Sequence, residues 1–135
     1  MHRGRAYTEA NALGERYPVY YSEDERRIVI RRFRYPDGWS PRFAELRYEL
    51  PNTYPRDMPA AYVPAALSYE SGSPEHLMRY SSPPGADGDE WSKWCIENHA
   101  SSWNPEQDSL LKFTQLMYAS LSHPNADNPF EVMEP

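Results

Sequence analysis

Hydrophobic and polar residues alternate most regularly over residues 43–50, where every second position is apolar. A period of two predicts a β-strand with one buried and one solvent-facing side. Residues 27–34 are rich in β-branched and aromatic side chains and predict a second strand. Residues 60–67 predict a third strand, which Pro64 displaces toward the edge of a sheet because proline lacks the N–H that a ladder needs.

Helical spacing of apolar residues appears at both ends of the chain. Residues 4–16 predict a short helix that ends near Gly14, with Tyr7, Ala10 and Leu13 on one face. A longer helix is predicted from Asn104 to residue 122, where Asn104 is a suitable N-cap and Pro105 suits the first helical position. Its apolar face comprises Leu110, Phe113, Met117 and Leu121.

The stretches between these elements are of two kinds. Residues 51–59 contain three prolines and predict a rigid extended loop, whereas residues 70–92 are rich in serine, glycine, proline and acidic residues and predict a long irregular loop. The order of elements therefore predicts a single α+β domain over residues 1–135. We expect an N-terminal helix, an antiparallel meander of about four strands, the long loop and one main C-terminal helix.

Composition narrows the functional classes. The chain has 135 residues and a formal net charge of −6, which argues against binding to a nucleic-acid backbone. No apolar run is long enough to cross a bilayer, and no hydrophobic segment follows the first five residues. One cysteine cannot form an internal disulfide, which fits a reducing compartment. We therefore expect a cytoplasmic protein that binds neither membranes nor nucleic acids.

The single cysteine, Cys95, stands eight residues before Trp103, and Asn104-Pro105 follows that tryptophan. Upstream, residues 50–59 read Leu-Pro-Asn-Thr-Tyr-Pro-Arg-Asp-Met-Pro, and residues 121–129 read Leu-Ser-His-Pro-Asn-Ala-Asp-Asn-Pro. These landmarks occur in the order and at the spacing typical of one family. Over about three quarters of its length, the chain resembles the ubiquitin-conjugating enzymes.

The resemblance implies a transferase of the UBC-like fold. In this family an active-site cysteine accepts the C-terminal carboxyl of a ubiquitin-like protein from an activating enzyme by thioester exchange. It then delivers the acyl group to an amine. The resemblance assigns this role to Cys95 and implies a ubiquitin-like protein, an activating enzyme, and a ligase or target protein as partners. It implies no cofactor.

Further site residues follow from their positions around Cys95. Asn98 and His99 are candidate donors to the thioester oxyanion, although an ordinary polar loop residue is the simpler interpretation of each. Asp87 stands eight residues before Cys95, where a gapless match would put the asparagine of the family's His-Pro-Asn motif. The candidates for substrate contact are Trp94, Trp103 and Asn128, with core packing as the alternative for the two tryptophans.

The sequence leaves open whether the protein is an active transferase and whether its basic strand docks a partner. A free cysteine is often a small buried apolar residue, and the chain lacks the upstream His-Pro-Asn motif. It could therefore be an inactive UBC-like module that binds a ubiquitin-like protein or another partner. A metal site is poorly supported, because one cysteine and four scattered histidines show no ligand spacing. The basic strand 27–34 is either a solvated face or a docking face for an acidic partner.

Overall fold

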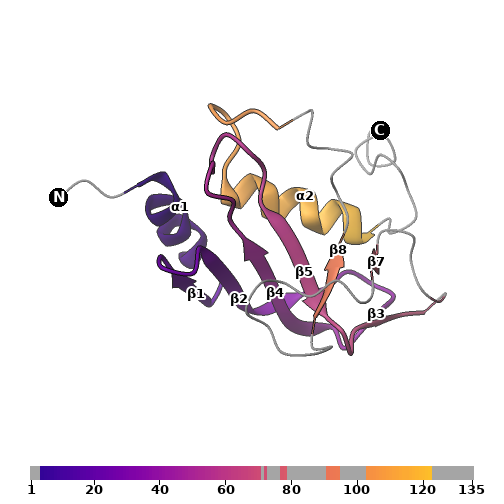
Figure 1. Cartoon of the computed structure of the whole chain (residues 1–135). Coiled ribbons are helices and arrows are strands. Elements are labelled where there is room, and N and C mark those ends of the chain that lie inside the picture. Colours follow the sequence, from indigo (N-terminus) through magenta and orange to yellow (C-terminus); the bar gives the residue numbers. More distant parts are fainter. Residues whose placement is uncertain (1–3, 71, 73–76, 79–90, 95–102, 123–135) are drawn as a thin grey trace.

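The computed structural model describes residues 4–70, 72, 77–78, 91–94 and 103–122. Within these residues two helices pack with antiparallel strands, which confirms the predicted α+β class (Figure 1). The helices are α1 (Arg5–Gly14) and α2 (Leu110–Ser122). The strands are β1 (Val19–Ser22), β2 (Arg27–Arg34), β3 (Trp39–Ser40), β4 (Phe43–Glu49), β5 (Ala60–Pro64), β6 (Ser68–Tyr69), β7 (Leu77–Met78) and β8 (Trp91–Trp94).

The main sheet of the described chain has the strand order β1-β2-β4-β5-β8-β7, and β3 pairs separately with β6. Its first four strands form the expected meander, while β8 and β7 extend it beyond the expected size. Because β5 lies between β4 and β8, the edge position predicted from Pro64 is wrong. Pro64 is tolerated because it is the last residue of β5, and the Leu67 N–H turns back to its carbonyl (3.0 Å).

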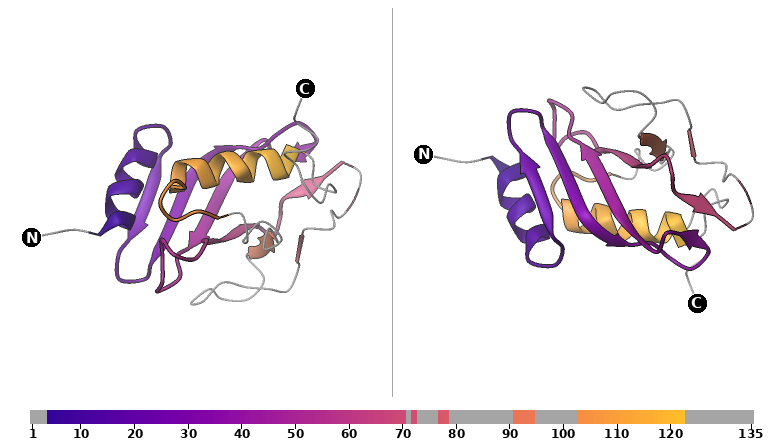
Figure 2. Two further views of the ribbon diagram at one scale, coloured as in Figure 1. Left: turned by 90° about the horizontal axis from the view of Figure 1, so that it is seen from above. Right: turned by 90° about the horizontal axis from the view of Figure 1, so that it is seen from below.

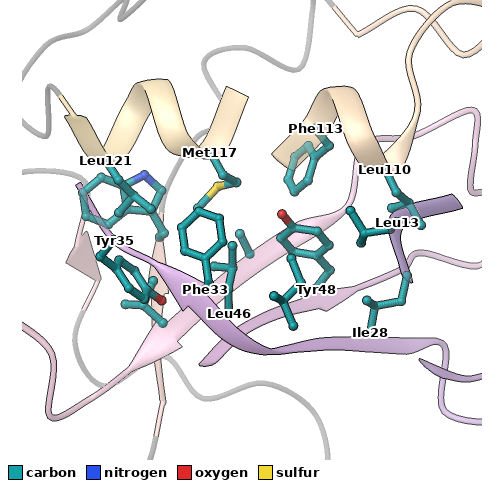
Figure 3. Packing of buried hydrophobic residues seen from close by; sticks show 14 of the residues in the cluster. Leu13, Ile28, Phe33, Tyr35, Leu46, Tyr48, Leu110, Phe113, Met117 and Leu121 are labelled. Carbon is teal, nitrogen blue, oxygen red and sulfur yellow. The ribbon is translucent and has the colours of Figure 1, made fainter. Parts of the chain in front are cut away.

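The hydrophobic core lies between the sheet and α2. From α2, the apolar side chains point down onto the strands, and Leu13 of α1 joins them beside Leu110 and Ile28 (Figure 3). The predicted apolar faces are confirmed at the buried residues Ala10, Leu13, Leu110, Phe113, Met117 and Leu121. Tyr7, which was also predicted on the face of α1, is only partly buried. Since both helices serve this one layer, the opposite face of the sheet carries no described helix (Figure 2).

The start of α2 differs from the prediction. Asn104 accepts a hydrogen bond from the Glu106 N–H (3.0 Å) and its own N–H donates to Asp108 Oδ2 (2.6 Å), which closes a separate turn. The helix begins only at Leu110, with the Ser109 hydroxyl accepting the Lys112 N–H at 3.2 Å. The capping chemistry expected at Asn104 is present, but it stabilises a turn that precedes the helix.

Two tyrosines are completely buried in the core. The Tyr35 hydroxyl donates to the Glu45 carbonyl (2.6 Å). The Tyr48 hydroxyl lies 2.7 Å from Thr114 Oγ1, which itself donates to the Leu110 carbonyl. Because Thr114 has a single hydroxyl proton, Tyr48 is the donor in that pair. Burial raises the pKa of both phenols well above the ordinary value of tyrosine.

Candidate functional site

Strand β8 ends at Trp94, the residue immediately before Cys95 in the sequence. The Trp94 side chain is fully buried, and its Nε1 donates to Ser120 Oγ at 2.8 Å. Its ring meets the Trp39 ring edge-on, with centroids 5.7 Å apart. The chain therefore enters the cysteine segment, residues 95–102, from a strand end that is anchored to the last turn of α2.

Trp103 ends the cysteine segment on the other side. Its Nε1 donates to the Pro55 carbonyl (2.8 Å). Its ring meets the Phe113 ring of α2 edge-on, with centroids 6.1 Å apart. The same indole lies 6.2 Å from the Tyr54 ring, measured between centroids. Trp103 thus fastens the end of the segment to both α2 and the Tyr-Pro loop, residues 51–59.

The two ends of the cysteine segment are held by one helix. Ser120 and Phe113 are seven residues apart on α2, a rise of about 10 Å along the helix axis. Eight residues reach at most about 29 Å when fully extended, less than three times that length. The structure therefore fixes the residues on either side of the segment, Trp94 and Trp103.

One carboxylate, that of Glu9 in α1, joins α1 to the Tyr-Pro loop and to α2. Its side chain is only 11% exposed. Oε1 accepts hydrogen bonds from the Tyr54 hydroxyl (2.5 Å) and from the N–H of Leu110 (2.8 Å), the first residue of α2. Glu9 therefore caps α2 from another element, and its negative charge complements the positive end of the helix dipole.

Arg5 completes this junction. Its Nε pairs with Glu9 Oε2, and its other nitrogens donate to the carbonyls of Pro105 and Asp108 in the turn before α2. Burial, and next the hydrogen bond to Glu9, raise the pKa of Tyr54 far above its ordinary value. Tyr54 therefore remains a protonated donor into the alkaline range, and it holds the loop to which the Trp103 indole is bound.

We expect the Glu9→Ala substitution to lower the free energy of unfolding by about 2 kcal/mol, because it leaves the Leu110 N–H and the Tyr54 hydroxyl without their acceptor. Glu9→Gln retains an oxygen acceptor and should cost about half as much. Urea unfolding measures both values. Glu15→Ala, which removes an exposed carboxylate just after α1, is the matched control and should change stability by less than about 0.5 kcal/mol. Equal small effects for all three variants would contradict the role given to Glu9.

Most of the residues predicted for the site lie outside the described residues: Cys95, Asn98, His99, Asp87 and Asn128. Trp94 and Trp103 are described, and the structure brings both to α2, at different turns. Their contacts agree with the packing interpretation: Trp94 is fully buried, and Trp103 packs against the hydrophobic core.

Sequence reasoning did not find the Arg5–Glu9 pair. Four residues apart on a short helix, these charges look like an ordinary surface pair of opposite sign. The sequence marks the Tyr-Pro loop, but nothing in its residues indicates that Tyr54 donates to a carboxylate 45 positions earlier.

The described part of the chain adds neither a membrane-spanning helix nor a group of metal ligands. None of its helices has the length and apolar character needed to cross a membrane. Among the same residues, no three histidine, cysteine, aspartate or glutamate side chains gather as metal ligands would. Comparison of the chain with protein-family models, curated proteins and solved structures finds no match.

Proposed function

We propose that this chain is a ubiquitin-conjugating-enzyme-like transferase. Cys95 carries the C-terminal carboxyl of a ubiquitin-like protein as a thioester and passes it to an amine. The proposal includes the UBC-like arrangement of the domain, a cytoplasmic location, and an activating enzyme and a target or ligase as further partners. Asn98, His99 and Asp87 are its candidate supporting residues, with Asn128 beside the incoming amine.

One observation carries the proposal. The segment that contains the only cysteine begins and ends against α2, through Trp94 and Trp103, and Trp103 also binds the Tyr-Pro loop. Trp103 and the Tyr-Pro loop are two of the landmarks on which the family resemblance was based, and they contact each other. Anchored ends favour a nucleophile on a short segment, because acyl transfer needs the sulfur in a defined position relative to its partner.

The chemistry requires two exchanges at one sulfur. The Cys95 thiolate attacks the thioester carbonyl on the activating enzyme, so a new S–C bond forms and the enzyme's own thiolate leaves. The amine then attacks the Cys95 thioester. Its C–N bond forms as the S–C bond breaks, the Cys95 thiolate leaves, and the amine proton passes to a base or to water. No metal or redox step is needed.

We expect Cys95 to react with a maleimide in the folded protein about as fast as in urea, because a carrier thiol must be reachable by a partner's tail. Mass spectrometry after short reaction times measures both rates. This test needs no partner protein, and no second cysteine interferes. Labelling that occurs only after unfolding would reject the carrier role and leave the inactive module, which binds a ubiquitin-like protein without a covalent bond.

The direct test combines the protein, ATP, a ubiquitin-like protein and an activating enzyme whose own thioester has first been demonstrated. We expect a band on a non-reducing gel that thiol reductant removes. Cys95→Ala should abolish the band, and Cys95→Ser should replace it with an oxyester that resists reductant but is cleaved by hydroxide. Transfer that survives in Cys95→Ala would place the chemistry elsewhere. Binding of the modifier without any band would support the inactive module.

A further inference from the structure

The face of the sheet opposite α2 contains an irregularity in β2. Ile30 pairs with Leu46 and Phe33 pairs with Ala44, so two residues of β2 lie opposite the single residue Glu45 of β4. This is a β-bulge. The two residues of the bulge are Arg31 and Arg32, and both side chains are exposed. Simple alternation would have sent one of two consecutive side chains toward the core.

Each of these arginines lies over an exposed aromatic ring. The Arg31 guanidinium carbon is 5.7 Å from the centroid of Tyr20, and that of Arg32 is 4.3 Å from the centroid of Phe43. Tyr20 and Phe43 are 46% and 47% exposed, among the most exposed large apolar side chains that the structure describes. A guanidinium that rests on a ring is held in place while its N–H donors at the edge stay available.

The arginines of this sheet fall into two groups. Arg27 and Arg47 both bind the Glu49 carboxylate. No carboxylate of the described residues forms an ion pair with Arg31, Arg32 or Arg34. Against these three positive charges the bulge carries only Glu45, so the surface has a local excess of two positive charges on a chain of net charge −6. Such a surface attracts an acidic partner.

A shallow, widely open hollow of about 380 Å³ lies beside Arg31. Tyr20, Val29, Arg31 and Glu45 line it, so it has apolar side chains from β1 and β2 and a charged rim. The view from below shows this side of β2 and β4 in front of α2 (Figure 2). A partner segment with an apolar side chain between carboxylates would match an apolar hollow beside arginines.

We propose that this arginine surface, comprising Tyr20, Val29, Arg31, Arg32, Arg34 and Phe43, docks an acidic segment of a partner protein. Carboxylates of the segment pair with the three arginines, and an apolar side chain enters the hollow beside Tyr20 and Val29. A protein segment fits better than a nucleic acid. A nucleic-acid backbone is charged at every nucleotide and would extend past three arginines onto an acidic protein, whereas a short segment can end within the surface. The inference does not depend on Cys95.

The test measures fluorescence anisotropy with a labelled ten-residue peptide of glutamates around one central phenylalanine. We expect it to bind, and a peptide with glutamine in place of glutamate to bind about tenfold more weakly or worse. Arg31→Glu with Arg32→Glu should weaken binding of the acidic peptide by about tenfold or more, and added salt should weaken it in the unsubstituted protein. The control, Arg16→Glu with Arg56→Glu, makes the same charge change at exposed arginines elsewhere. It should weaken binding of the acidic peptide by less than about twofold.

Circular dichroism confirms that each variant is folded. If the double charge reversal does not fold, Phe43→Ala with Arg32→Gln tests the same surface and should also weaken binding. Three results would overturn the proposal: no binding of the acidic peptide, binding that the surface variants leave unchanged, or tighter binding of a single-stranded DNA oligonucleotide through the same arginines. The last result would assign the surface to nucleic acids.

Discussion

Replacement of Trp94 by alanine should be the most destabilising single change, with a loss of about 4 kcal/mol in the free energy of unfolding. The indole is fully buried, and it contacts Trp39 edge-on. Its removal would leave a cavity between β8 and α2, and the cavity adds to the lost transfer free energy. The Ser120 hydroxyl would also lose the Nε1 donor that lies 2.8 Å away. Urea unfolding, monitored by far-UV circular dichroism, measures the effect.

The matched control is Trp91→Ala, two residues earlier in the same strand. Trp91 is only partly buried, with the Arg47 guanidinium over its ring, so its removal should cost markedly less than that of Trp94. Trp94→Phe keeps most of the volume and loses the hydrogen bond, and it should fall between the two. If Trp94→Ala does not fold, the prediction still requires that Trp94→Phe lower the free energy of unfolding more than Trp91→Ala does. Equal losses at the two positions would show that Trp94 is not the anchor of β8.

The second large effect is an alkaline loss of stability caused by Tyr35 and Tyr48. Both phenols are completely buried, and burial raises the pKa of each above the ordinary tyrosine value of about 10. Above that pH the unfolded chain releases these protons while the folded chain keeps them. The contribution of these two phenols to the free energy of unfolding is therefore fully present below about pH 10. It falls as the pH rises from there toward the folded-state pKa values. Each phenol should contribute about 1.4 kcal/mol per pH unit.

Phenylalanine substitutions separate the contributions. Tyr48→Phe and Tyr35→Phe should each lower stability at neutral pH, because Thr114 and the Glu45 carbonyl lose their donors. Each should also reduce the slope of stability against pH above about pH 10 by about 1.4 kcal/mol per unit. Phe43→Leu replaces a ring that is 47% exposed and removes no titratable group, so it should leave the slope unchanged. Urea midpoints at several pH values give the slopes, and identical slopes in all four proteins would refute the assignment.

Local patterns predicted the elements well where burial follows a regular period. The strand at 27–34 has the expected bounds, the one at 43–50 ends a residue earlier, and the apolar faces of both helices are buried as expected except at Tyr7. The third predicted strand is shorter than expected, and β1, β3, β6, β7 and β8 were not predicted as strands. These strands have two to four residues, too few to show a period. Their pairing depends on neighbours distant in the sequence, such as Ala61 for Trp94.

The start of α2 shows why capping signals mislead. Asn104, Pro105 and Gln107 have the residue types that begin a helix, and the Asn104 side chain does accept a backbone N–H. What delays the helix to Leu110 is long-range: Arg5 binds the carbonyls of Pro105 and Asp108, and Glu9 caps Leu110. A local motif specifies which hydrogen bonds are favourable. The rest of the fold decides which of them are formed.

The sequence alone determined the α+β class and the apolar faces of the helices, and it is the source of the predicted resemblance to ubiquitin-conjugating enzymes and of the proposal of Cys95 as the nucleophile. These conclusions follow from residue types, spacing and period, which are properties of neighbouring positions. Only the tertiary structure decided that Trp94 and Trp103 fasten the cysteine segment to α2, that Glu9 joins three elements, and that a bulge gathers two arginines on one face. Each of these depends on contacts between residues far apart in the chain or on the register of two strands.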